Sequence, residues 1–539
     1  MTRKNLSHTD WIIAVFISLA AIWLHFIFLT HAGGLWRDEV AITNISRLPT
    51  LGQLWQALPH DHCPIVFPVL VRLWSRLGLG ATDAGLRILG LGFGLFLLTT
   101  FWIASRMMGK GLPLLSVALA GLNFTMIRYG DSVRAYGLAT ACLLLTMALI
   151  WRFIEAPNPR RGLMAGLAAV LSVQVLYQNA FFLLAIGTAG AVVCLRRSQH
   201  RSALTILSIG TVAALSLLPY LSPIYHAQSW WIVNKTGIDW GIFFNRILSA
   251  TGILAGVWLV LPIIAVLFGT GYTLVNIPRK ETDIRQDLPL FASIALVVGL
   301  AGFAIFIKLT SLPTQSWYYI PAMGFTVVCC DAILPRIHRV VHLAVLMVAV
   351  IAGSLAFSSA FSSLKWRQTN GDLVAAWASQ KASPNDLIIV HPWYYGITFA
   401  HDYRGATPWT TLPPLADYRF HRYDLFKAAM QKTNAIEPVL EKVKTTLSSG
   451  HQVWLVGRIP MPQSEAPPVD LPPAPYSPYG WDDEPYSYAW GTQLSYLLIH
   501  HITNAASLID TSTNFTNPLE NMALVRTSGW RSPAQTSPP

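Results

Sequence analysis

Two adjacent carboxylates follow the first long apolar stretch of the sequence. They are Asp38 and Glu39 in the run Trp36-Arg37-Asp38-Glu39, so an aromatic ring and a guanidinium stand beside them. A carboxylate that is partly removed from water can act as a general base while its neighbour holds a hydroxyl group or a cation. The alternative is a solvated loop in which Arg37 neutralises one acid. The pair is therefore a candidate catalytic site, and the dipeptide alone leaves both interpretations open.

A second group of polar side chains lies further along the same connection, in the run His60-Asp61-His62-Cys63. Imidazole, carboxylate and thiol groups all ligate transition metals. Because neighbouring side chains diverge, only some of them could bind one ion, and Asp38 or Glu39 would have to complete its ligand shell. A plain polar loop is the simpler alternative. We name His60, Asp61 and His62 as candidate ligands of a divalent metal ion.

Several arginines lie where the chain is otherwise apolar. Arg87 stands a few residues into the second apolar stretch, where a cation needs an anionic partner or a water-filled cavity. A lipid phosphate would be such a partner, and snorkelling to the headgroups is the alternative. Arg128, Arg134 and Tyr136 crowd a later turn, where two guanidiniums could bind a phosphate unless Asp131 neutralises one of them. All four of the basic and tyrosine side chains are candidates for binding the phosphate of a lipid.

Membrane helices are the elements that must position these residues. Of the 539 residues, 53% are hydrophobic and only 12% are charged, about half the charged fraction of a soluble protein. The formal net charge of +12 could suggest nucleic acid, but the basic residues form short clusters between apolar runs rather than one basic face. We therefore predict a polytopic α-helical membrane protein that binds membrane lipid and no nucleic acid.

Apolar runs separated by helix breakers predict about eleven transmembrane helices. They fall near residues 11–30, 83–105, 111–127, 133–153, 162–178, 180–195, 202–220, 247–270, 289–308, 317–334 and 340–360. Basic residues in alternate connections place those connections, and the N-terminus, in the cytoplasm. The first connection, about residues 31–83, is then extracytoplasmic, and its segments 51–58 and 65–77 are expected to form short interfacial helices. The expected location is the bacterial inner membrane.

After residue 361 the pattern changes to alternating short helices and strands. Helices are expected at 372–381 and 434–447, and buried strands at 386–390 and 452–456, which together are typical of an α/β domain with a parallel sheet. A Pro-rich segment at 459–486 is expected to be extended and to precede a helix near 487–503 and a strand near 522–526. No glycine-rich phosphate loop accompanies the strands, so nucleotide binding has no support. We divide the chain into a transmembrane domain, 1–361, and an extracytoplasmic α/β domain, 362–539.

The motifs together resemble the GT-C glycosyltransferases of the protein mannosyltransferase and aminoarabinose transferase type. The resemblance covers about the first 155 residues well and the later helices only in style. It rests on four runs: Trp36-Arg37-Asp38-Glu39, Cys63-Pro64-Ile65-Val66-Phe67, Gly85-Leu86-Arg87 and Arg134-Ala135-Tyr136.

The resemblance implies an enzyme that takes a sugar from a polyprenyl-phosphate donor. It implies that Asp38 is the catalytic base, that Glu39 is its supporting acid and that Arg87 meets the lipid phosphate, with Arg134 and Arg128 as further cations. Some relatives hold a divalent ion in this role. This sequence departs from the family pattern at two places: His62-Cys63 replaces a Glu-Lys pair, which removes a lysine contact to phosphate, and Trp317-Tyr318-Tyr319 replaces Arg-Tyr.

The predicted topology agrees with this implication, because an extracytoplasmic site has no nucleotide sugar available. The implied reaction is inverting, with an envelope glycan, a glycolipid or a protein as acceptor. Trp393 and Tyr394 in the C-terminal domain are aromatic candidates for contacts on the acceptor side. A secondary transporter is the main alternative, although no internal repeat is apparent, and a lipid-binding envelope assembly protein is another.

Overall fold

The computed structural model describes residues 7–61, 63–230, 239–275, 284–310, 314–336, 339–460, 467–512 and 515–531. The chain divides into two compact units. One contains Met1–Thr30, Cys63–Ser222 and Thr236–Lys365, and the other contains His31–His62, Pro223–Lys235 and Trp366–Pro539.

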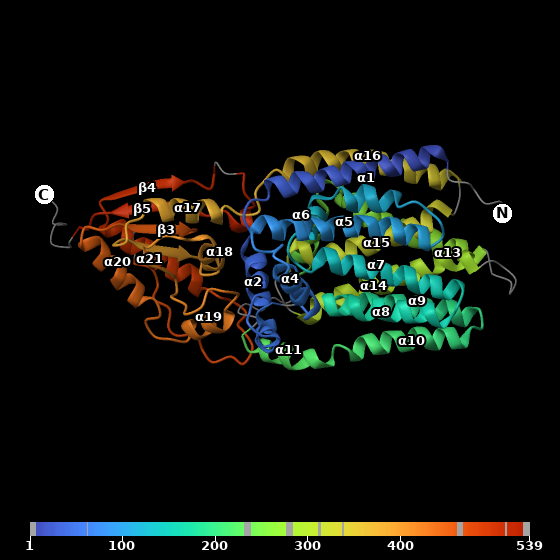
Figure 1. Cartoon of the computed structure of the whole chain (residues 1–539), viewed down its shortest axis with the longest axis horizontal. Helices are drawn as coiled ribbons and strands as arrows, with labels where there is room; N and C mark the ends of the chain where they lie inside the picture. The colour runs from blue at the N-terminus through green and yellow to red at the C-terminus, as the bar shows by residue number, and fades with distance from the viewer. Residues whose placement is uncertain are drawn as a thin grey trace. The chain divides into compact units, whose positions relative to one another are not determined.

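The first unit consists of helices, and its long helices run side by side (Figure 1). Most of the buried side chains in these helices are apolar, as expected of helices that pack against one another and against lipid. The unit contains α1 (His8–His31), α4 (Val66–Arg76), α5 (Asp83–Met107), η2 (Ser116–Gly121), α6 (Phe124–Gly130), α7 (Tyr136–Glu155), α8 (Pro159–Val175), α9 (Asn179–Arg196), α10 (His200–Leu215), α12 (Trp240–Thr251), α13 (Ala255–Val275), α14 (Leu288–Thr310), α15 (Ile320–Ile333) and α16 (Arg339–Ser363).

Eight helical segments of the described residues are long and apolar enough to cross a membrane, which confirms the polytopic helical fold. They are His8–His31, Asp83–Met107, Tyr136–Glu155, Asn179–Arg196, His200–Gln228, Trp240–Val275, Ile284–Thr310 and Val340–Ser363.

Three of the predicted spans, 111–127, 162–178 and 317–334, do not correspond to any of these eight segments. The stretch 111–127 is divided at Asn123, whose side chain accepts a hydrogen bond from the Met126 amide and begins α6 there. Helix α8 has 17 residues and α15 has 14. The total of about eleven spans stays a prediction.

The second unit contains a five-stranded sheet with the order β2-β1-β3-β5-β4. Strand β1 (Leu387–His391), the second in this order, is parallel to β2 (Trp409–Thr411) and to β3 (Val453–Gly457), with Ile389 opposite Leu455. Strand β5 (Ala523–Ser528) is antiparallel to β3 and to β4 (Asn504–Ile509). The prediction of a small α/β domain is thus confirmed. The sheet is mixed and not wholly parallel, because β5 is antiparallel to both of its neighbours, β3 and β4.

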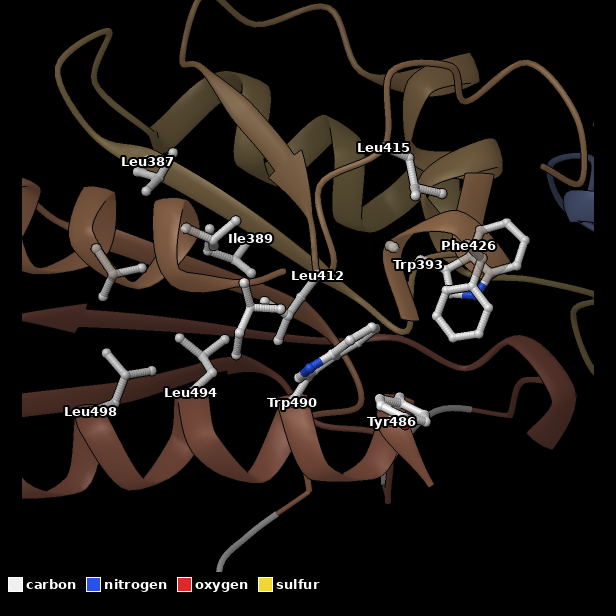
Figure 2. Packing of buried hydrophobic residues seen from close by; sticks show 14 of the residues in the cluster. Leu387, Ile389, Trp393, Leu412, Leu415, Phe426, Tyr486, Trp490, Leu494 and Leu498 are labelled. Atoms are coloured by element: carbon white, nitrogen blue, oxygen red, sulfur yellow. The ribbon is translucent and has the colours of Figure 1, made fainter. Parts of the chain in front are cut away.

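Helices cover both faces of this sheet. On one face, α17 (Gly371–Lys381) and α18 (Tyr395–Asp402) pack on Ile388 and Val390. On the other face, Leu387 and Ile389 meet side chains of α19 (Tyr423–Met430), α20 (Glu437–Ser448) and α21 (Tyr486–His501), as Figure 2 shows for α21. Burial on both faces explains the unbroken apolar run of β1.

The predicted local elements of this unit are largely confirmed. Helices 372–381, 434–447 and 487–503 correspond to α17, α20 and α21, and strands 386–390, 452–456 and 522–526 correspond to β1, β3 and β5. The described residues of the Pro-rich segment have no regular structure before α21. In the first connection, the predicted short helices are present as α3 (Leu51–Ala57) and α4.

Residues 31–61 belong to the same compact unit as the described residues from Trp366 onward. Helix α2 (Arg37–Ser46) packs against α18, and the Gln368 amide donates to the Ala32 carbonyl oxygen at 2.8 Å. Gly33 has a positive φ of 73°, and a Cβ there would lie 2.4 Å from the Arg367 guanidinium. Glycine is therefore required where the chain enters this unit.

Candidate functional site

The two adjacent acids lie in the first turn of helix α2, where negative charge is favourable for the helix dipole. The side chain of Glu39 is fully buried, and its Oε2 accepts a hydrogen bond from the Trp36 amide at 3.3 Å. Glu39 thus satisfies an amide group that the start of the helix would otherwise leave without a partner. The Asp38 side chain keeps 15% of its surface exposed. The two acids consequently have different surroundings, which the sequence did not reveal.

Two nitrogen-bearing side chains approach the same oxygen of Asp38. The Oδ1 atom lies 3.6 Å from Nε of Arg37 and 3.4 Å from Nε2 of His421. Arg37 is the preceding residue in the chain, whereas His421 comes from the connection between β2 and α19. The carboxylate of Asp38 is thereby held in place from two sides.

Arg37 is fixed by contacts from three directions. Its Nη1 donates to the Leu519 carbonyl oxygen at 3.1 Å and to Oε2 of Glu520 at 3.3 Å, and its guanidinium lies 4.8 Å from the centre of the Tyr394 ring. Burial alone would lower the pKa of Arg37, but the charges of Asp38 and Glu520 raise it above its ordinary value. Arg37 is therefore a permanent cation beside Asp38.

Glu520 is a fully buried carboxylate that sequence reasoning missed. It ends the short helix η8 (Pro518–Glu520) and accepts hydrogen bonds from Thr398 at 2.6 Å, from Thr369 at 2.9 Å and from the Arg37 amide at 3.1 Å. Burial raises the pKa of Glu520, while Arg37 and the two hydroxyl groups oppose that change. The number of its partners indicates that this acid organises the start of α2.

The two aromatic residues proposed for the acceptor side differ in their surroundings. Tyr394 lies against the Arg37 guanidinium and meets Tyr395 edge-on, with ring centres 5.1 Å apart. Trp393 is buried in the core and stacks on Phe426 at 5.4 Å (Figure 2). The geometry places Tyr394 against Arg37, the residue next to Asp38, and favours a packing role for Trp393.

His60 is packed between aromatic rings. It stacks on Trp230 at 4.7 Å and meets Phe420 at 4.8 Å, and its Nδ1 lies 3.1 Å from the His421 carbonyl oxygen. Burial lowers the pKa of His60 to about 4, although the negative charge of Asp424 opposes this decrease. His60 is therefore neutral near pH 7, and Nδ1 is its donor.

The metal hypothesis for the run 60–62 stays a prediction. Asp61 is buried, and His62 lies outside the described residues. Within the part of the chain that the structure describes, His60 and Asp61 belong to no group of three metal-ligating side chains.

The predicted phosphate-binding arginines lie in the first unit. Arg87 of α5 is buried, and its guanidinium is 5.9 Å from the centre of the Phe28 ring. Arg128 of α6 is also buried, and its Nη2 donates to the Ser363 carbonyl oxygen at 2.5 Å. Both arginines are therefore cations on helices of the first unit and are shielded from water.

Asp131 has a partner that the sequence did not indicate. Its Oδ2 lies 2.7 Å from Nδ1 of His25 in α1, and both side chains are buried. The turn containing Asp131 comes so close to α5 that a Cβ on Gly90 or Gly94 would lie 1.8 or 1.7 Å from its atoms. Arg134 follows in this turn, and Tyr136 begins α7 with its ring 6.1 Å from that of Tyr318.

No protein-family model and no curated protein sequence matches the chain. Among solved structures, ArnT from Cupriavidus metallidurans in the apo state has a TM-score of 0.50 at 12% identity, covering 83% of this chain and 93% of that one. The chain has the fold of ArnT. A structure of the same ArnT bound to undecaprenyl phosphate has a TM-score of 0.49 at 14% identity, covering 84% and 93%.

The similarity to ArnT confirms the fold that the sequence motifs implied. It extends well beyond the first 155 residues, which the resemblance in sequence covered best, because more than four fifths of this chain is covered. The roles of individual residues stay predictions at this level of identity.

Proposed function

We propose that this protein is a membrane glycosyltransferase that moves a sugar from a polyprenyl-phosphate donor to an acceptor outside the cytoplasm. The observation that carries the proposal is the setting of Asp38: a partly exposed carboxylate held by Arg37 and His421, in a chain with the ArnT fold. ArnT binds undecaprenyl phosphate, and we assign a lipid donor of this class to the present chain.

In the proposed reaction, Asp38 is the general base. It accepts the proton of an acceptor hydroxyl group while the hydroxyl oxygen attacks the anomeric carbon of the sugar. The bond between that carbon and the phosphate oxygen breaks on the opposite face, so the configuration of the anomeric carbon is inverted. Glu39 supports the base indirectly, because its contact with the Trp36 amide fixes the turn that carries Asp38.

The leaving polyprenyl phosphate gains negative charge as the bond breaks. Cations that meet it at that moment stabilise the transition state more than the ground state. We assign this role first to Arg87, then to Arg134 and Arg128, with Tyr136 as a further phosphate contact. The burial of Arg87 and Arg128 supports the assignment, since both guanidiniums are shielded from water.

A divalent ion held by His60, Asp61 or His62 is a subsidiary hypothesis. The Nδ1 atom of His60 donates to a carbonyl oxygen, which leaves Nε2 as the atom that could ligate an ion. Such an ion would supply positive charge for the leaving phosphate.

We place the reaction on the extracytoplasmic face of the bacterial inner membrane, with the N-terminus in the cytoplasm and the C-terminal domain outside. An envelope glycan, a glycolipid or a protein is then the acceptor. Tyr394 supports an acceptor-side role for the C-terminal domain, because its ring is near the Asp38 and Arg37 pair.

Donor choice tests the proposed function. Purified protein in proteoliposomes is supplied with undecaprenyl-phosphate mannose or aminoarabinose, or with a nucleotide-linked mannose, and sugar released to acceptor or water is measured. We expect release from at least one lipid-linked donor and none above background from the nucleotide sugar. Faster release from the nucleotide sugar would contradict the proposal, and movement of the intact lipid-linked sugar across the bilayer would favour a transporter.

A further inference from the structure

His421 is a histidine that the sequence motifs do not include, yet its ring reaches the proposed catalytic base. Its Nε2 lies 3.4 Å from Oδ1 of Asp38, and the two side chains are 12% and 15% exposed. We propose that His421 is a positioning residue for Asp38, an inference that rests on the proposed function. The C-terminal part of the chain would thereby serve the chemical step as well as the acceptor.

The imidazole of His421 is itself held firmly. Its ring lies nearly parallel to that of Tyr423, with centres 5.9 Å apart and planes at 11°. Its carbonyl oxygen lies 3.1 Å from Nδ1 of the neutral His60. Contacts on the ring and on the backbone therefore fix His421 from two directions.

Ion pairs brace the segment that carries this histidine. Asp417 accepts from Arg419 at 3.0 Å and from Arg422 at 2.6 Å, and Arg422 also donates to Asp424 at 2.7 Å. Burial would raise the pKa of Asp417, but the hydrogen bonds from Arg419 and Arg422 lower it to about 2. These pairs consequently stay ionised near pH 7 and hold the segment at both ends of His421.

An N–H group beside a general base can fix the orientation of that base. When Nε2 carries the ring proton, that N–H group lies at the ring edge 3.4 Å from Oδ1 of Asp38, and with Arg37 near the same oxygen it limits rotation of the carboxylate. A base that is already oriented loses less freedom on reaching the transition state. The same logic describes catalytic dyads in which a third group orients the base. His421 should thus affect turnover more than donor binding.

Two substitutions separate positioning from mere packing. His421→Ala removes the ring N–H group, whereas His421→Gln retains an amide N–H that can reach the position of Nε2. His451→Ala is the matched control, since His451 is a half-buried histidine just before β3, outside both α2 and the segment that carries His421. We measure kcat and KM for undecaprenyl-phosphate mannose or aminoarabinose, whichever the wild type uses, in proteoliposomes.

We expect His421→Ala to lower kcat by about 10- to 100-fold with the donor KM changed little. His421→Gln should recover most of the loss, and His451→Ala should match the wild type. In an Asp38→Asn background, His421→Ala should add little further loss, because residues that act as a unit are not additive.

A wild-type kcat in His421→Ala would overturn the positioning role. Equal losses of kcat in the alanine and glutamine variants would overturn it too. So would a loss of kcat in the double variant with Asp38→Asn that equals the two single losses combined. The wild type and Asp38→Asn alone report on the proposed function. If the wild type cleaves no lipid-linked donor, the proposed function fails and the role of His421 fails with it. If the wild type cleaves the donor and Asp38→Asn does not, the proposed function stands whatever His421 does.

Discussion

Asp38→Asn is expected to lower the rate of sugar transfer by about 100-fold or more. Asparagine has nearly the same size and can keep contacts with Arg37 and His421, but its amide is too weak a base to accept the acceptor proton. The fold should persist, since the side chain remains partly exposed at the start of α2. The loss should therefore appear in turnover and not in stability.

Initial rates of transfer, together with binding of undecaprenyl phosphate and the temperature of unfolding in detergent, check this expectation. Asp483→Asn is the matched control, because it neutralises an exposed carboxylate of the same unit. We expect the control to retain its rate and Asp38→Asn to retain lipid binding. A transfer rate near that of the wild type in Asp38→Asn would contradict the role of Asp38 as general base.

Glu520→Ala is expected to have the largest effect on stability. It leaves the Arg37 guanidinium and the hydroxyl groups of Thr369 and Thr398 without their buried anion. Breaking a buried ion pair by removing one partner costs about 3 kcal/mol or more. The free energy of unfolding should fall by that amount, and transfer should fall too, because Arg37 adjoins Asp38.

The double variant Arg37→Met with Glu520→Leu separates the two effects. Removing both charges avoids an unpaired buried ion, so much of the stability should return. The transfer rate should remain low, since Asp38 has then lost its neighbouring cation. Unchanged unfolding of Glu520→Ala would show that this network contributes nothing to the fold, and a rate restored in the double variant would exclude a role for Arg37.

The sequence predicts most of the fold because local patterns mark most of its elements. The unbroken apolar run at 387–390 identifies β1 as a strand buried on both faces. Strand β4, Asn504–Ile509, was missed because it is a partly exposed edge strand with small and polar residues. The three-residue β2 is too short to have any pattern of its own. The mixed sheet also escaped prediction, because strand direction depends on chain connections.

The candidate site could be predicted only where its residues are neighbours in sequence. Asp38 and Glu39 form a recognisable pair beside Arg37, and a motif could find them. Glu520 and His421 are single residues in unremarkable surroundings, and only folding brings them to the start of α2. The burial of Glu39 likewise follows from its contact at the start of α2, a helix that the sequence motifs do not indicate.

The configuration of the transferred sugar tests the central claim most directly. A single displacement in which Asp38 deprotonates the acceptor predicts that the anomeric carbon is inverted relative to the polyprenyl-phosphate donor. Nuclear magnetic resonance of the first product formed by the wild type from a donor of known configuration gives the answer. Inversion is the expected result. Retention would require a covalent sugar–enzyme intermediate, with a carboxylate as nucleophile, and would contradict the role of Asp38 as general base.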